Sequence, residues 1–171
     1  MKSDDLNVVK NTIDFNTDNT FLTDGSKDFL TVLDPEFRKL DSEGKTVIIT
    51  DPYLFKAPAN QPDYTNNLKT LLRNLKAHKL IWSGIVTPAN SICYADVIAD
   101  LNTIGCSLTV QTVTRPFHGR QWICAESKKG ITVDTSLNGF QSKIGYVHDT
   151  PEDEVEEIIS LFGLGNDEEN E

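Results

Sequence analysis

The strongest constraint on the fold is a regular alternation of apolar runs and helical patterns between residues 45 and 113. Residues 45–50 form a continuous run rich in β-branched side chains, which predicts a buried strand. Similar runs at 80–86 and 107–113 predict two further strands, and helices are expected at 63–75 and 91–104. The first helix carries leucines at positions i, i+3, i+4 and i+7, namely Leu68, Leu71, Leu72 and Leu75.

Two more strands, 121–125 and 130–133, follow closely and predict a hairpin. The resulting order β-α-β-α-β-β-β predicts an α/β domain with a mixed β-sheet flanked by helices. In such sheets functional loops gather at the carboxyl ends of the parallel strands. We therefore expect the loops Asp51-Pro52-Tyr53 and Thr87-Pro88 to lie at one edge.

The two ends of the chain complete this prediction. Short strands are expected between Leu6 and Leu22, followed by a helix that Ser26 caps and that ends before Pro35. An acidic helix is expected from Pro151 to Phe162. The chain is predicted to form one domain over residues 1–163, with the motif-bearing segment at 45–149, and a disordered acidic tail at 164–171.

Charge is distributed unevenly along the chain. The net charge of −10 divides into −5 for residues 1–44, +4 for 45–149 and −9 for 150–171. An acidic exterior disfavours loose binding to nucleic acid or anionic lipid, because that affinity comes largely from lysine and arginine. A local basic site in the central segment remains compatible with this distribution.

The cysteines and the apolar runs indicate a cytoplasmic protein. Cys93, Cys106 and Cys124 are odd in number, lack paired spacing and lie in apolar segments, which is typical of reduced, buried thiols. No metal site or cofactor is expected. No apolar run approaches the length of a membrane span, and the polar start of the chain shows no signal-peptide pattern.

A small group of polar residues stands out against this scaffold. His118 and Arg120 are two apart on an expected strand, so their side chains should share a face. After the next strand, Ser136 and Asn138 are again two apart. A nucleophile, a guanidinium and two neutral hydrogen-bonding groups are suited to grip, and to attack, a phosphate.

These residues carry a family resemblance. The patterns His118-Gly119-Arg120 and Thr135-Ser136-Leu137-Asn138-Gly139 resemble the phospholipase D superfamily signature, H-x-K-x4-D-x6-G-S-x-N. The strand that ends in Asp51-Pro52-Tyr53 is similar to one that opens many bacterial members. The resemblance covers roughly residues 45 to 145, and it implies a phospholipase D-like half-unit.

The resemblance also implies a metal-independent phosphodiesterase, a nuclease or phospholipase D-like hydrolase. His118 would attack phosphorus to give a phosphohistidine, Arg120 would clamp the phosphate, and Ser136 with Asn138 would be supporting donors. Because the chain holds one copy of the motif, a homodimer is expected, with His118 of each subunit contributing to one site. Nucleic acid is slightly favoured over a smaller phosphodiester ligand.

The sequence departs from the family pattern at several positions. Arg120 replaces lysine, Thr135 replaces glycine, and Ala125 stands where aspartate is expected. Glu126 or Asp134 would then have to orient His118, and Tyr53 is expected to pack over the site.

Simpler alternatives remain for these residues and for the protein. Arg120 could pair with Asp134 across the sheet, and Ser136 with Asn138 could form a turn. The chain could also be a catalytically degenerate module for ligand sensing, or a protein-protein assembly domain that uses its acidic C-terminal helix.

Overall fold

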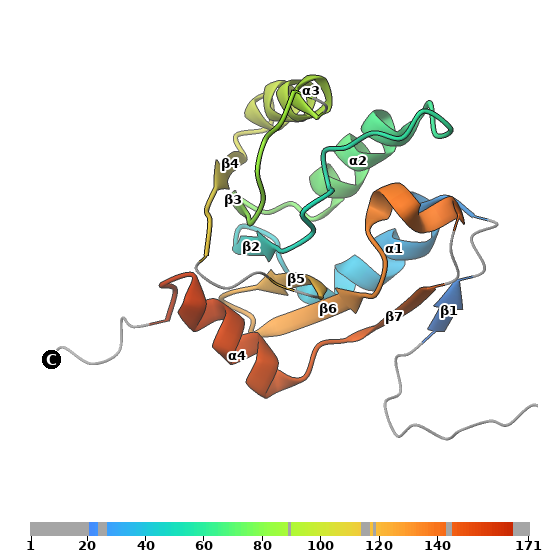
Figure 1. Ribbon diagram of the computed structural model, residues 1–171. Helices are drawn as coiled ribbons and strands as arrows, with labels where there is room; N and C mark the ends of the chain where they lie inside the picture. Colours follow the sequence, from blue (N-terminus) through green and yellow to red (C-terminus); the bar gives the residue numbers. More distant parts are fainter. Residues whose placement is uncertain are drawn as a thin grey trace, which may run out of the picture.

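One mixed sheet organises the structure, a computed structural model that describes residues 21–23, 27–88, 90–113, 117, 119–142 and 145–165. Within these residues the sheet has seven strands in the order β1-β7-β6-β5-β2-β3-β4 (Figure 1). The strands are β1 (Phe21–Thr23), β2 (Thr46–Ile49), β3 (Lys79–Trp82), β4 (Ser107–Val110), β5 (Arg120–Cys124), β6 (Lys129–Val133) and β7 (Gly145–Asp149).

The sheet has a parallel half and an antiparallel half. Strands β2, β3 and β4 run parallel, whereas β5 pairs antiparallel with β2, and β6, β7 and β1 continue antiparallel. Parallel neighbours need a long crossover, and helices supply it between β2 and β3 and between β3 and β4. The predicted order of strands and helices from 45 to 133 is confirmed, while β7 was not predicted.

Helices cover both faces of the sheet (Figure 1). They are α1 (Phe29–Phe37), α2 (Tyr64–Asn74), α3 (Ser91–Asn102) and α4 (Glu152–Leu161). Side chains alternate along a strand, so Val47 and Ile49 of β2 pack in the cluster with α1, α2 and α3, and Ile48 packs in the cluster with α4. This two-sided burial explains why β2 reads as an unbroken apolar run.

The core confirms several expectations about individual side chains. Trp82 and Trp122 are fully buried, as their apolar surroundings predicted. The thiols of Cys93, Cys106 and Cys124 are free and buried. Burial raises the pKa of the Cys93 thiol, which keeps it in the less reactive protonated form.

The first helix differs from its prediction. We expected it to end before Pro35, but α1 runs through Pro35 to Phe37. Its N-cap is Asp28, whose carboxylate accepts a hydrogen bond of 2.8 Å from the Thr31 amide. Buried Phe29, Leu33 and Phe37 hold this helix on the sheet, so packing overrides the helix-breaking tendency of proline.

Other predictions for the ends of the chain lie outside the described residues. They concern the strands expected between residues 6 and 20 and the last six residues of the tail. The expected cap at Ser26 is wrong, because Asp28 caps α1.

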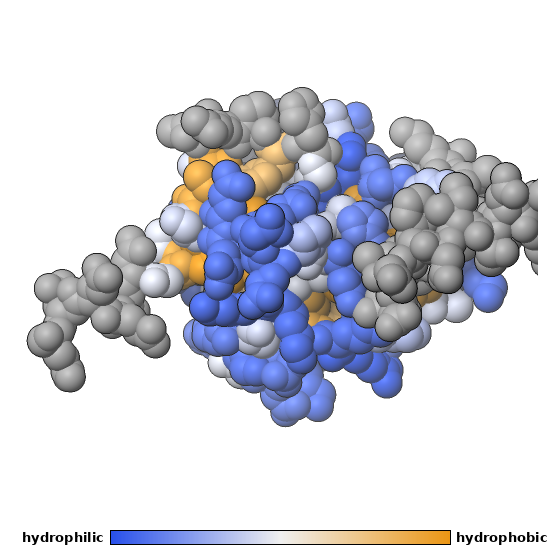
Figure 2. Space-filling model, turned by 90° about the horizontal axis from the view of Figure 1, so that it is seen from below, coloured by the Kyte–Doolittle hydropathy of each residue, from blue (hydrophilic) through white to orange (hydrophobic). Residues whose placement is uncertain are grey.

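The acidic helix α4 presents its carboxylates to solvent. Glu152, Asp153, Glu156 and Glu157 are exposed, whereas Val155 and Ile158 are buried against the sheet. The surface seen from below Figure 1, where α4 lies, is largely hydrophilic (Figure 2). Among the helices that the structure describes, none is long and apolar enough to cross a membrane.

Replacement of Pro35 tests how strongly packing constrains α1. Pro35 is exposed and cannot donate a backbone hydrogen bond inside the helix. Alanine restores the backbone hydrogen bond inside the helix, but it also gives the unfolded chain more conformational freedom, which opposes the gain. We expect Pro35→Ala to raise the free energy of unfolding, measured in urea, by about 1 kcal/mol in total. Ser160→Ala, at an exposed position of α4, is the control and should change stability by less than about 0.5 kcal/mol. A destabilised Pro35→Ala protein would contradict this account.

Candidate functional site

Five of the residues singled out from the sequence line one depression, which we call the polar pocket. Its lining consists of Tyr53, Lys56, Arg120, Thr135, Ser136, Asn138 and Gly139. Tyr53 and Lys56 come from the loop between β2 and α2, and Arg120 opens β5. The remaining four lie between β6 and β7, partly in the short 3-10 helix η2 (Leu137–Ser142). The pocket therefore joins three segments that are distant in sequence.

A buried carboxylate ties two of these segments together. Asp51 is 1% exposed and accepts hydrogen bonds from the Ser136 hydroxyl at 2.7 and 2.8 Å. It also accepts from the backbone amides of Leu137 at 3.0 Å and Tyr53 at 3.0 Å. Its own carbonyl accepts from the Trp82 indole at 2.7 Å. A buried carboxylate needs such donors, so these contacts fix the loop after β6 against the end of β2.

Burial raises the pKa of Asp51, because the low-dielectric interior disfavours its charged form. The hydrogen bonds from Ser136, Leu137 and Tyr53 act in the opposite direction, as does the positive charge of Arg120. Burial outweighs these opposing effects. Asp51 is therefore a structural acceptor whose environment resists ionisation.

Arg120 lies at the start of β5, which hydrogen bonds fix to the segment after β6 and to the end of β2. Its guanidinium donates from Nη1 to the backbone carbonyl of Asp134 at 3.3 Å. The next residue, Gln121, donates its amide to the Thr50 hydroxyl at 2.7 Å, which fixes the start of β5 beside the end of β2. Arg120 therefore contacts Asp134 through the backbone carbonyl, whereas the alternative raised from the sequence was a salt bridge between the two side chains.

The loop that carries Tyr53 and Lys56 is anchored by its two middle residues. Leu54 and Phe55 are fully buried, and Phe55 packs edge-on against Trp82 with ring centroids 4.6 Å apart. The Tyr64 hydroxyl of α2 donates to the Leu54 carbonyl at 2.5 Å. This anchoring leaves the flanking Tyr53 and Lys56 exposed at the pocket.

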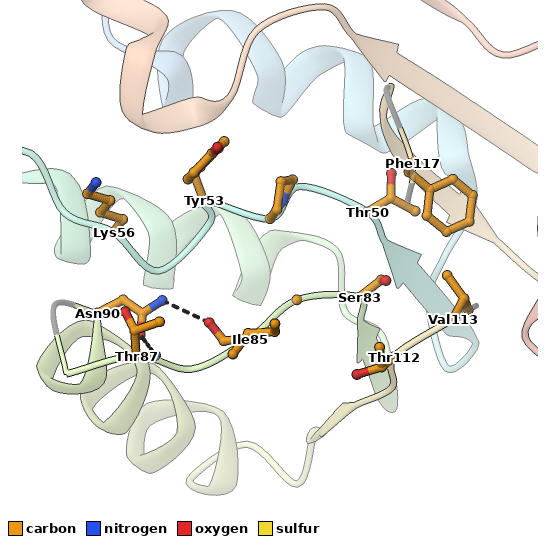
Figure 3. Close-up of a pocket in the computed structure, with 12 residues that line it drawn as sticks. Thr50, Tyr53, Lys56, Ser83, Ile85, Thr87, Asn90, Thr112, Val113 and Phe117 are labelled. Carbon is orange, nitrogen blue, oxygen red and sulfur yellow. Dashed lines mark hydrogen bonds between the residues drawn. The ribbon is translucent and has the colours of Figure 1, made fainter. Parts of the chain in front are cut away.

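A second depression, which we call the apolar cavity, adjoins the polar pocket. It has a volume of about 510 Å³ and lies beyond the carboxyl ends of β2, β3 and β4. Its walls include Tyr53, Ile85, Val113 and Phe117, with the hydroxyls of Ser83 and Thr112 at one end (Figure 3). Tyr53 and Lys56 line both depressions. The expected clustering of loops at one sheet edge is confirmed for these elements.

The structure brings together most, but not all, of the predicted site residues. His118 lies outside the described residues, and its neighbours Phe117 and Arg120 line the apolar cavity and the polar pocket respectively. Glu126 lies at the other end of β2, where its carboxylate accepts from the Thr46 amide at 2.9 Å. The Asp134 carboxylate accepts from the Tyr146 amide at 2.8 Å, a contact between β6 and β7.

Lys56 was missed in the sequence, and Asp51 was placed in a loop at the functional edge but given no role of its own. Lys56 supplies a second cation, and Asp51 supplies the central acceptor. The signal for Asp51 was its place directly after a buried strand, because functional loops gather at the carboxyl ends of parallel strands. Lys56 follows five positions later in the same loop, but nothing in its local pattern distinguishes it from a surface lysine.

The arrangement can bind an anion. Two cationic side chains, an amide and a hydroxyl face one depression, which is the chemistry that phosphate oxygens require. Among the residues that the structure describes, no group of three or more His, Cys, Asp or Glu side chains could hold a metal ion.

Comparisons with known proteins show a similarity of fold, and we call the solved structure described below the fold relative. No family model matches the chain, and no curated protein matches its sequence. Among solved structures, the chain is similar to the crystal structure of polyphosphate kinase from Porphyromonas gingivalis, with a TM-score of 0.54 and 7% identity. The similarity covers 89% of this chain and 27% of the kinase. It supports the predicted fold class, a mixed β-sheet flanked by helices.

The raised pKa of Asp51 predicts a pH effect on stability. The folded protein holds the Asp51 proton more tightly than the unfolded chain, so protonation stabilises the fold as the pH falls through the raised pKa. That contribution is lost as the pH rises again. We expect the stability of the wild type relative to Asp51→Asn to be greater at pH 4.5 than at pH 7, as measured by urea unfolding.

The matched control is Asp63→Asn, which changes an exposed carboxylate just before α2. Its stability difference from the wild type should vary less between the two pH values. A wild-type advantage over Asp51→Asn that shrinks on acidification would contradict the assignment of burial as the dominant effect.

Proposed function

We propose that this protein binds the phosphate group of a phosphodiester or related phosphate ligand in the polar pocket. One observation carries the proposal: Arg120 from β5 and Lys56 from the β2–α2 loop line the same depression as Asn138. The guanidinium can grip two phosphate oxygens at once, and the ammonium adds a second positive charge. The amide of Asn138 can donate to a further oxygen.

The hydrogen bonds within the site refine the role of each residue. The Ser136 hydroxyl donates to the buried Asp51 carboxylate, so we assign Ser136 to positioning the loop that carries Asn138. Thr135 and Asn138 remain as the neutral groups for the phosphate, and Tyr53 forms one wall. The fold relative, which is named as a polyphosphate kinase, supports a phosphate-bearing ligand for this fold.

Catalysis by a symmetric dimer is a second candidate. Phe117 and Arg120, on either side of His118, border the apolar cavity and the polar pocket. An imidazole nitrogen of His118 would attack the phosphorus of the diester and expel one alcohol, which leaves a phosphohistidine that keeps the other ester bond. Water would then break the nitrogen–phosphorus bond and release a phosphate monoester. His118 of the second subunit would protonate the leaving oxygen. Nucleic acid is slightly favoured as the substrate because the central segment is basic.

Binding of phosphate ligands tests the first proposal. We expect Arg120→Gln and Lys56→Gln each to weaken binding of diethyl phosphate and of a short oligonucleotide by about tenfold, in isothermal titration calorimetry at low salt. Lys129→Gln is the matched control, because Lys129 is exposed and lies at the other end of the β5–β6 strand pair from Arg120. Equal affinities for all four proteins would overturn the proposed pocket.

Chemical trapping tests the second candidate. We expect an acid-labile phosphohistidine on the wild type after brief exposure to an activated phosphodiester, and its loss in His118→Ala. Light scattering after size exclusion should give twice the mass of 19.1 kDa. A monomer, or label that persists in His118→Ala, would rule out this mechanism and leave the binding function in place.

A further inference from the structure

The apolar cavity adjoins the polar pocket, because Tyr53 and Lys56 line both depressions. A ligand whose phosphate occupies the polar pocket can therefore place an attached organic group in the cavity without leaving the surface of the protein. The cavity volume of about 510 Å³ lies within the range of small-molecule sites, about 300–1,000 Å³.

Two of the apolar side chains that line this cavity are exposed to solvent. Ile85 is 71% exposed and Tyr53 is 48% exposed, and both line the cavity. In Figure 3 the Tyr53 and Ile85 side chains come from separate segments, the β2–α2 loop and the segment after β3, and Phe117 lies at the far end beside Thr50. Apolar side chains that line a cavity beside a charged pocket are typical of a ligand site.

The segment after β3 is held in shape around the cavity. A Cβ atom at Gly84 would overlap the Trp82 ring, so the backbone lies directly on the buried indole. The side-chain amide of Asn90 donates to the Ile85 carbonyl at 3.3 Å and connects the segment after β3 to the start of α3 (Figure 3). The Ile85 side chain is thus presented by an ordered backbone.

Polar groups are interspersed among the apolar ones. The hydroxyls of Ser83 and Thr112 lie at the end of the cavity near β3 and β4 (Figure 3). An alkyl chain would bury these hydroxyls without a partner, which is costly. A planar heterocycle offers apolar faces for Tyr53, Ile85 and Phe117 and hydrogen-bonding edges for the hydroxyls.

We infer that the apolar cavity binds the base of a nucleoside phosphate whose phosphate lies in the polar pocket. This inference rests on the proposed phosphate-binding function and extends it by naming the class of organic group. The base lies against Ile85, Tyr53 lies at the boundary between the base and the phosphate, and the polar edge of the base faces Ser83 and Thr112.

Calorimetric titration of the full chain with three phosphate monoesters tests this inference. The probes are cytidine 5′-monophosphate, ribose 5-phosphate and decyl phosphate below its micelle concentration. We expect the nucleotide to bind about tenfold more tightly than ribose 5-phosphate, which lacks the base. Equal affinities for those two, or tighter binding of decyl phosphate than of the nucleotide, would overturn the inference.

Two variants test whether the preference for the nucleotide arises in the apolar cavity. Ile85→Ala should weaken nucleotide binding about fivefold and leave ribose 5-phosphate binding unchanged. Thr112→Trp, at an exposed position, should fill the cavity and abolish the preference for the nucleotide. The matched control is Ile92→Ala, since Ile92 is 79% exposed on α3 and does not line the cavity. Thermal unfolding followed by circular dichroism checks that each variant is folded.

The two levels of the proposal fail in different ways. If Arg120→Gln weakens ribose 5-phosphate binding but Ile85→Ala and Thr112→Trp leave the nucleotide unaffected, the phosphate pocket stands and the base site is wrong. If Arg120→Gln leaves ribose 5-phosphate binding unchanged, the proposed phosphate pocket itself is wrong.

Discussion

The carboxylate of Asp51 is the contact on which the arrangement of the site depends. It lies at the carboxyl end of a buried strand, where water cannot solvate it, and it is satisfied by Ser136, Leu137 and Tyr53. The same residue accepts from Trp82 through its carbonyl. A buried carboxylate without hydrogen-bond donors would lower the stability of the fold by roughly several kcal/mol, so these donors are held in place. The end of β2, the end of β3 and the loop after β6 are thereby joined.

This network explains how a polar pocket and an apolar cavity come to share one wall. In the loop after Asp51, the buried pair Leu54 and Phe55 anchors the backbone. The exposed residues on either side of this pair, Tyr53 and Lys56, face the two depressions. Arg120 enters from the antiparallel side of the sheet. The fold relative shares the architecture at 7% identity, and architecture alone does not fix a function. The side chains of the polar pocket, rather than the architecture, are therefore what supports the proposed phosphate binding.

Most of the fold followed from local patterns. The apolar runs and the leucine spacing predicted β2, α2, β3, α3 and the β5–β6 hairpin, because burial on one or both faces imposes a period on the sequence. Strand β7 was missed because Val147 is the one buried apolar side chain among its five residues, so the segment carries no apolar run. The passage of α1 through Pro35 was also missed, because the stabilising contacts of Phe29, Leu33 and Phe37 are tertiary.

The sequence by itself determined the elements, their order and a motif that singled out Arg120, Ser136 and Asn138. Only the tertiary structure decided which of the motif residues meet, that Ser136 is bound to Asp51, and that Lys56 joins the pocket while Glu126 lies at the other end of β2. The physical reason is the distance along the sequence over which each kind of contact acts. Periodicity records the burial of neighbouring residues, whereas the contact between Asp51 and Ser136 spans 85 positions and exists only once the sheet has brought β2 and the end of β6 together.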